Sequence, residues 1–168
     1  FNANLFLNTT ALPIVDKVKD LGVIVDSQLS FVSQVDHMAA RAFTRANLIH
    51  KCFLSGDTAT LTRAFIVYVR PLLEYASCVW SPYQIGRISQ IESVQRKFTK
   101  RLRGLAMLSY GERLSCLGLE SLEMRRLRQD LVYCYKIIFG HVSGACSELF
   151  TLSSSVNSTV NTRGHIYK

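Results

Sequence analysis

The sequence contains none of the short motifs that commonly mark a nucleotide-binding or hydrolytic site. Its 168 residues include no GxxxxGK[ST] loop, no GxGxxG, no GxSxG and no HExxH, and no two aspartates are adjacent. The four histidines have no spacing that suggests a shared metal. The acidic residues are scattered one at a time, whereas two-metal phosphoryl chemistry needs clustered carboxylates. We therefore expect no catalytic residue, no metal site and no cofactor in this chain.

Paired cysteines are also absent. The five cysteines are odd in number and widely spaced, with no CxxC pair, so the sequence supports neither a disulfide framework nor a zinc knuckle. Cys134 falls on the apolar side of a predicted helix, where a cysteine is most often a small buried hydrophobe in a reducing compartment. We therefore expect an intracellular protein, located in the nucleus, the cytoplasm or both.

No apolar run is long enough to cross a bilayer. The most hydrophobic stretch is interrupted by Arg63, Arg70, Pro71 and Glu74, whereas a spanning helix needs about 20 predominantly apolar residues. The sequence begins Phe-Asn-Ala, with neither an initiator Met nor the pattern of a signal peptide. We expect a piece of a longer protein that has no membrane partner.

The chain has instead ample apolar material and an excess of positive charge. Hydrophobic residues make up 48% of the sequence, which predicts one folded domain and not a disordered chain. Lys and Arg exceed Asp and Glu by 20 to 12, a net charge of +8 that favours a polyanionic partner such as nucleic acid or an acidic membrane surface. Residues 41–140 alone have a net charge of +9, so the positive field belongs to the middle of the chain.

Hydrophobic periodicity predicts a mainly α fold, a helical bundle of about five helices preceded by a small N-terminal β-hairpin. Short apolar runs separated by turn residues extend to residue 26 and indicate two or three short strands, the last of them from Leu21 to Val25. We assign residues 1–27 to the hairpin and residues 28–140 to the helical bundle. The Ser-, Thr- and Asn-rich residues 141–168 are typical of a disordered, flexible tail.

From residue 30 the apolar period changes from two to about 3.6, which is typical of amphipathic helices. In the second helix Pro71 predicts a kink, because proline removes a backbone donor and crowds the carbonyl four residues before it. Ser109 and Glu112 form a capping box for the fourth helix, and Ser121 is the expected cap of the fifth. The predicted helices cover residues 30–53, 57–79, 84–104, 109–116 and 121–140.

The helices differ in what their two faces carry. The residues that the second helix is expected to bury are Leu61, Phe65, Tyr68, Leu72, Tyr75 and Val79. The apolar face of the third consists of Ile88, Ile91, Val94, Phe98, Leu102 and Leu105. On the opposite face of the third helix, Arg96, Lys100 and Arg103 fall within about 60° of one another. The outward residues expected of the fifth helix are Arg125, Arg126, Gln129 and Lys136, and those expected to face inward are Met124, Leu127, Leu131, Cys134, Tyr135 and Ile138.

Four runs of residues occur in an order that is highly specific, although each alone is a weak signal. They are Val18–Val23 (VKDLGV), Val69–Tyr75 (VRPLLEY), Val79–Tyr83 (VWSPY) and Ile91–Thr99 (IESVQRKFT). Together they resemble the C-terminal part of a non-LTR, LINE-type, jockey-like retrotransposon reverse transcriptase. The resemblance covers about residues 5–140.

This resemblance implies a place within a larger polymerase. The LGV strand would belong to a β-hairpin at the end of the palm, and the basic helices after it would form the thumb that grips the template–primer duplex. In that family the fingers and the palm motif with paired aspartates lie upstream, and Mg²⁺ is expected only there. The resemblance therefore implies an RNA–DNA or DNA duplex and the upstream palm and fingers of the same polyprotein as partners, and no polymerase activity for this chain alone.

The basic side chains of the helices are the candidates for contact with nucleic acid. A helix that carries clustered cations and belongs to a polymerase thumb binds phosphates without reading the sequence. The residues predicted to make most of the contact are Arg96, Lys97, Lys100 and Arg103, with Arg41, Arg45, Arg125 and Arg126 supporting them.

Other interpretations remain open at this point. A basic face can simply be a solvated surface, and the chain would then be a non-catalytic helical module for interaction or structure, or the relic of a decayed element. Trp80 and Tyr83 favour core packing or a contact at a helix end over base stacking. Arg70 and Glu74 are one helical turn apart and can pair with each other.

Overall fold

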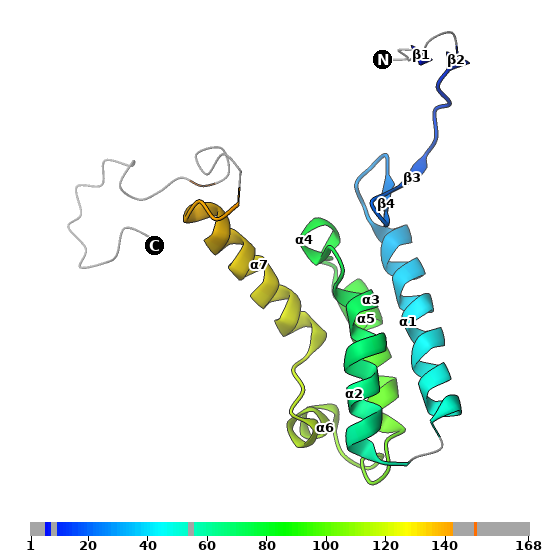
Figure 1. Ribbon diagram of the computed structural model, residues 1–168, viewed down its shortest axis with the longest axis vertical. Helices are drawn as coiled ribbons and strands as arrows, with labels where there is room; N and C mark the ends of the chain where they lie inside the picture. Colours follow the sequence, from blue (N-terminus) through cyan, green and yellow to red (C-terminus); the bar gives the residue numbers. More distant parts are fainter. Residues whose placement is uncertain (1–5, 8–9, 54–55, 143–149, 151–168) are drawn as a thin grey trace, which may run out of the picture. The chain divides into compact units, whose positions relative to one another are not determined.

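A computed structural model describes residues 6–7, 10–53, 56–142 and 150 of the chain. Within these residues there are seven α-helices and two small antiparallel hairpins, which confirms the predicted mainly α fold behind a β-hairpin (Figure 1). The chain divides into two compact units, Phe1–Arg126 and Leu127–Lys168. Nearly all of the predicted tail, residues 141–168, lies outside the described residues.

The N-terminal strands are shorter than the apolar runs suggest. Strand β1 (Phe6–Leu7) pairs with β2 (Thr10–Ala11), and β3 (Lys17–Asp20) pairs with β4 (Val23–Asp26). Leu21 and Gly22 connect β3 to β4 with φ of +43° and +89°, the pair of positive angles that a tight two-residue hairpin turn needs. The last strand therefore begins at Val23, and the prediction that it begins at Leu21 is wrong.

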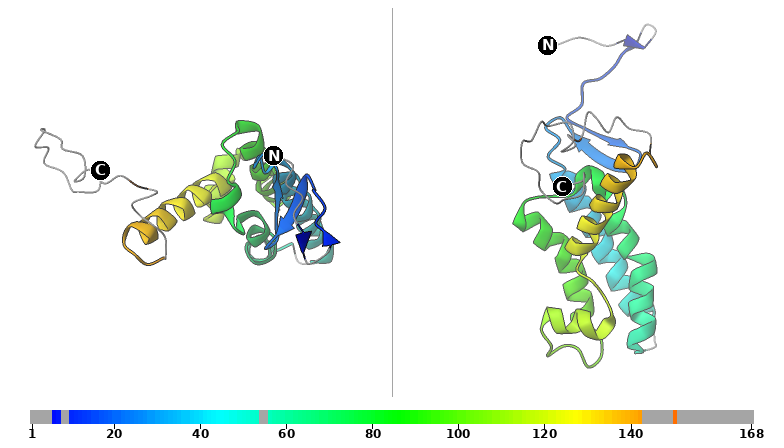
Figure 2. Two further views of the ribbon diagram at one scale, coloured as in Figure 1. Left: turned by 90° about the horizontal axis from the view of Figure 1, so that it is seen from above. Right: turned by 90° about the vertical axis from the view of Figure 1, so that its left-hand side faces the viewer.

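The second hairpin is fastened to the helices by side-chain hydrogen bonds. The Ile24 amide donates to Oε1 of Gln34 at 2.9 Å, and the Tyr75 hydroxyl donates to the Leu21 carbonyl at 2.8 Å. Val23 is buried in the same core as the helices. Figure 2 shows β3 and β4 at the end of the bundle where α1 begins.

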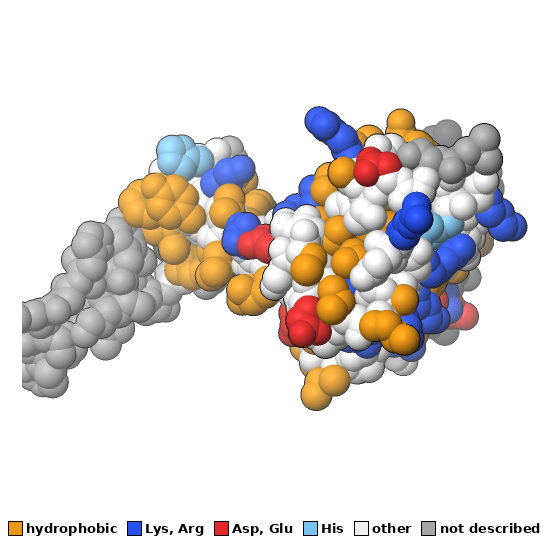
Figure 3. Space-filling view, turned by 90° about the horizontal axis from the view of Figure 1, so that it is seen from below, with side chains coloured by type: hydrophobic (Ala, Val, Ile, Leu, Met, Phe, Trp, Pro, Cys, Tyr) orange, Lys and Arg blue, Asp and Glu red, His pale blue; other side chains and the backbone are white. Residues whose placement is uncertain are grey.

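Three helices, α1 (Val32–Cys52), α2 (Thr58–Tyr68) and α5 (Ile85–Lys100), lie side by side and enclose the core (Figure 1). Phe65 of α2 and Phe98 of α5 are buried, with their ring centroids 4.6 Å apart. Lys and Arg side chains lie on the outer surface, as the view from below in Figure 3 shows. Buried residues recur at helical spacing in α1 and α5, and they are Val35, Met38, Ala42, Ala46, Ile49, Ile91, Val94 and Phe98.

The predicted second helix is broken into α2, α3 (Arg70–Glu74) and α4 (Ser77–Trp80). Pro71, in the first turn of α3, supplies no amide to continue α2. Ala76, with φ of +53°, separates α3 from α4, and the Trp80 indole satisfies the Tyr75 carbonyl at 2.7 Å.

The buried face of the segment is displaced by one position from the predicted face after Phe65. The residues found in the core are Leu61, Phe65, Val69, Leu73 and Trp80. The predicted burial of Tyr68, Tyr75 and Val79 is wrong, since all three are more than half exposed. The prediction assumed a continuous helix, and the faces of α3 and α4 no longer follow from the face of α2.

Helices α6 (Tyr110–Leu117) and α7 (Leu122–Ile138) begin at the predicted caps. Ser109 and Glu112 form the capping box, and Ser121 Oγ accepts from the Met124 amide at 3.2 Å. Buried Arg113 joins α6 to α5, because its Nε donates to Thr99 Oγ1 at 3.2 Å.

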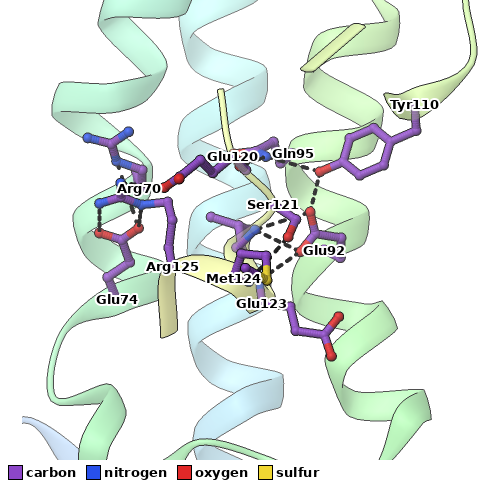
Figure 4. A network of polar contacts seen from close by, with 11 residues as sticks. Arg70, Glu74, Glu92, Gln95, Tyr110, Glu120, Ser121, Glu123, Met124 and Arg125 are labelled. Carbon is purple, nitrogen blue, oxygen red and sulfur yellow. Dashed lines mark hydrogen bonds and ion pairs between the residues drawn. The ribbon is translucent and has the colours of Figure 1, made fainter. Parts of the chain in front are cut away.

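A buried carboxylate on α5 fixes where α7 starts (Figure 4). Glu92 is 6% exposed, and its carboxylate accepts from the Leu122 amide at 3.0 Å and from the Glu123 amide at 3.3 Å. Its Oε1 also accepts from the Tyr110 hydroxyl. The first amides of a helix have no intrahelical acceptor, so a side chain from another helix supplies it. Burial and the bond to Glu92 raise the pKa of Tyr110, which keeps the hydroxyl a donor.

Replacement of Glu92 by Gln should lower the free energy of unfolding by about 1–3 kcal/mol, because an amide brings its own N–H groups to a site already full of donors. Urea unfolding of the variant and the parent measures the loss. Glu123→Gln is the matched control, since Glu123 is exposed and its replacement should cost no more than about 0.5 kcal/mol. Equal effects of the two substitutions would contradict the role assigned to Glu92.

Candidate nucleic-acid interface

The exposed face of α5 is cationic along its second half. Arg96, Lys97 and Lys100 are exposed, and Arg101 and Arg103 continue the series just past the helix end. On the opposite face Val94 and Phe98 are buried, as predicted. The helix has one acidic residue, Glu92, and it is buried. No ion pair among the described residues involves these five cations, so their charge is not neutralised by neighbouring carboxylates.

Neighbouring helices hold several of these cations in place. Lys97 Nζ lies 4.8 Å from the ring centroid of Phe43 on α1, and Arg96 Cζ lies 5.1 Å from that of Tyr110 on α6. Arg101 donates from Nη1 to Asn47 Oδ1 at 2.7 Å. A cation over an aromatic face is attracted by the ring quadrupole. The cations therefore spread from the α1 side of α5 to its α6 side.

Between α1 and α5 lies a cavity of about 420 Å³ that we call the α1–α5 groove. Its apolar floor includes Val94 and Phe98, and Lys97, Lys100 and Arg101 line it as cations. The lining from α1 consists of Phe43, Ala46, Asn47 and His50. No carboxylate is among the lining residues. Arg101, Asn47 and His50 could not be identified from the sequence, because the groove joins residues of α1 and α5 that are more than 40 positions apart.

His50 lines the α1–α5 groove next to Phe98. Its ring centroid is 4.5 Å from that of Phe98 with the planes 38° apart, and its Nε2 is buried with no hydrogen-bond partner. Burial, with the positive charge of Arg101 adding to it, lowers the pKa of His50 below its usual value. The side chain is therefore neutral at physiological pH.

Arg41 and Arg45 are exposed but do not belong to the groove. At about 100° per residue they lie near one another on α1 and roughly half a turn away from Phe43 and His50. Arg41 lines a separate cavity of about 300 Å³ with Lys19, His37 and Tyr75. The structure thus brings Lys97 and Lys100 together and leaves Arg41 on another side of α1.

Two of the arginines of α7, Arg125 and Arg126, are buried or half-buried. Arg126 is 2% exposed, so the prediction that it points outward is wrong. The predicted inward face of this helix is wrong as well, because Met124, Leu127, Leu131 and Tyr135 are at least half exposed. Arg126 lies one turn beyond Leu122, which is fully buried, and residues four apart share a helix face. Arg125 donates through Nε and Nη2 to Glu74, the latter at 3.1 Å to Oε2 (Figure 4).

Two further predictions concern the pairing of Arg70 with Glu74 and the packing of Trp80 and Tyr83. The Arg70–Glu74 pairing is confirmed, with Nε and Oε1 3.8 Å apart, although Arg125 is the closer partner of Glu74. Trp80 is 1% exposed and belongs to the core, as predicted. Tyr83 is 89% exposed, so its predicted packing is wrong.

In the described ranges of the chain, no three His, Cys, Asp or Glu side chains are grouped so that they could hold a metal ion. Cys52, Cys78 and Cys116 are exposed and Cys134 is half-buried, and all four are outside disulfides. None of the helices given there is both long and apolar enough to span a bilayer.

His50 predicts a dependence of stability on pH. The unfolded chain takes up a proton near pH 6.5, whereas folded His50 stays neutral to a lower pH, so the free energy of unfolding should fall as the pH drops below 6.5. His50→Gln should show a shallower fall over the same range in denaturant titrations. His37→Gln, at an exposed histidine, is the control and should keep the slope of the parent; a parental slope in His50→Gln as well would contradict the assignment.

Comparison with known proteins gives a distant relative, the uncharacterised protein B0403.1 of Caenorhabditis elegans. The two sequences are 27% identical over 130 residues, which cover 76% of this chain and 66% of the relative. The chain thus spans just under two-thirds of the relative's length. No protein-family model matches the chain, and no solved structure matches it. What the chain does has to be inferred from its own residues.

Proposed function

We propose that this chain is the C-terminal, thumb part of a non-LTR retrotransposon reverse transcriptase and binds the template–primer duplex through phosphate contacts. The observation that carries the proposal is the unneutralised cationic face of α5, made of Arg96, Lys97, Lys100, Arg101 and Arg103. The resemblance of the VKDLGV, VRPLLEY, VWSPY and IESVQRKFT runs to that family supports it. Arg41 and Arg45 can extend the contact around α1, whereas buried Arg126 cannot reach a phosphate.

The chemistry of the face suits a polymer of phosphates. Cations displace the counterions condensed on nucleic acid, and this gives affinity that depends on salt and little on sequence. The face is mounted on a helix whose other side is locked in the core by Val94 and Phe98. Cations held on such a rigid support lose less freedom on binding than cations on a mobile loop.

The second hairpin and the residues just before it support the part of the proposal that concerns an upstream partner. Ile14, Val18 and Leu21 are 78%, 53% and 85% exposed. Exposed apolar side chains gathered in one segment favour contact with another surface. In the proposed polymerase that surface is the palm of the same polyprotein, in the nucleus or the cytoplasm of the cell.

A second candidate function is that of an interaction module without nucleic acid. It is favoured by α7, where Leu127, Leu131 and Tyr135 recur at intervals of four residues and are 50%, 62% and 55% exposed. An unpartnered apolar stripe on a helix suits a helical protein partner. The two candidates differ in whether the cations of α5 matter for binding.

Replacement of Lys97, Lys100 and Arg103 by Ala should weaken binding to an RNA–DNA duplex and reduce its salt dependence. Each lost phosphate contact lowers the slope of log affinity against log salt by about one unit. Fluorescence anisotropy at several salt concentrations measures both effects.

The matched control replaces three exposed cations elsewhere, Lys17, Arg63 and Lys136, and changes the net charge equally. It should keep the salt slope of the parent.

Phe98→Ala is the complementary variant. It should cost about 3–5 kcal/mol of stability because the ring is buried, and it leaves the cations unchanged. If the triple variant bound as tightly as the parent at every salt concentration, the interaction module would replace the thumb as the proposed function.

The isolated chain should extend no primer with Mg²⁺ or Mn²⁺. Its sequence has no adjacent aspartates, and a polymerase needs clustered carboxylates to hold the metal ions that activate the primer hydroxyl. Incorporation of labelled nucleotide on a primed RNA template is the measurement. Incorporation above that of heat-inactivated protein would contradict this part of the proposal.

A further inference from the structure

The α1–α5 groove combines two features that a phosphate-binding surface alone does not need. It has an apolar and aromatic lining with the rings of Phe43, His50 and Phe98, and it has the cations Lys97, Lys100 and Arg101. We propose that the groove binds one unpaired nucleotide of a single-stranded nucleic acid, with its base against Phe43 and its phosphate among the three cations. The inference rests on the proposed function and specifies the form of nucleic acid that this side of α5 takes.

The size of the groove supports a nucleotide over a lone phosphate. Its volume of about 420 Å³ falls within the range of about 300–1,000 Å³ that is typical of pockets for small organic ligands. Such pockets are mostly apolar with a few placed polar groups, as this one is. Val94 and Phe98 are already buried in the core, so the apolar surface that a base can cover is the half-buried ring of Phe43, which a phosphate alone would leave uncovered.

The charges supply the phosphate site. Lys97, Lys100 and Arg101 line one cavity that no carboxylate lines, so a bound anion relieves their mutual repulsion. Arg101 is already oriented, since it donates to Asn47 Oδ1 at 2.7 Å. An oriented guanidinium gives directional hydrogen bonds to phosphate oxygens, and the lysines add flexible point charges.

The ring of Phe43 supplies the stacking surface. In the structure Lys97 Nζ lies 4.8 Å from its centroid, an exposed contact that is weaker than the stacking of a base on an aromatic side chain. Lys97 can move from the ring to the phosphate, and the base can then take the place of the ammonium. A base within a duplex is stacked and paired and cannot enter, so the groove discriminates in favour of a single strand.

The experiment compares a short single strand with a blunt duplex of the same length, using anisotropy with the full chain. Phe43→Leu removes the ring, keeps an apolar side chain and leaves the charge unchanged. It should weaken binding of the single strand by about 5- to 10-fold and binding of the duplex by less than about 2-fold. Phe53→Leu, the same substitution at an exposed ring at the end of α1, should leave both affinities at those of the parent.

A measurement without any variant covers the case in which Phe43→Leu fails to fold. Titration of the parent chain with thymidine monophosphate should shift the amide resonances of Asn47, His50 and Arg101 more than those of Lys17 and Arg63. An acidic peptide of equal charge should compete with the single strand only weakly.

The inference is overturned if Phe43→Leu weakens single strand and duplex equally, if it weakens neither, or if the acidic peptide competes as well as the oligonucleotide. Shifts spread evenly over the exposed cations would overturn it as well. If the chain still binds the duplex in a salt-dependent way after any of these results, the proposed function stands and only the inference about the groove fails. A chain that binds neither nucleic acid overturns the proposed function itself.

Discussion

The buried carboxylate of Glu92 is the constraint on which the C-terminal half of the larger unit depends. A carboxylate taken out of water has to be surrounded by donors, and Glu92 finds them in the first amides of α7 and in the hydroxyl of Tyr110. The start of α7 and the position of α6 are therefore set by one side chain of α5. The same helix carries the cations on its other side, so the groups that organise the fold and those that face solvent are held on one rigid element.

This arrangement explains why α5 can concentrate positive charge without losing its structure. Like charges three and four residues apart destabilise an isolated helix, and the one acidic residue of α5, Glu92, is buried on the other side of the helix. The loss is compensated by burial of Ile91, Val94 and Phe98 and by the network around Glu92. Because the like charges of this face repel one another in the free protein, binding of an anion lowers their electrostatic energy.

The sequence predicted the elements whose signals are local. The apolar period of α1 and α5 and the Ser109 capping box describe single segments, and each was confirmed. The face of the segment from Leu61 to Trp80 was predicted wrongly, because burial passes from Phe65 to Val69 and not to Tyr68 at the end of α2, and the break at Ala76 then resets the helical phase. Neither the capping role of Glu92 nor the groove around His50 could be predicted, because each depends on helices that are distant in sequence.

The break between α3 and α4 also holds an intrinsic fluorophore, the indole of Trp80. Trp80 is the single tryptophan of the chain, it is buried, and its indole is hydrogen-bonded to the Tyr75 carbonyl at that break. Intrinsic fluorescence excited at the indole band therefore reports on one place, the junction where the helical chain changes direction beside the second hairpin. Opening of that junction would turn an apolar, fixed indole into a hydrated one and shift its emission to longer wavelength, while events confined to the surface of α5 would leave the signal silent.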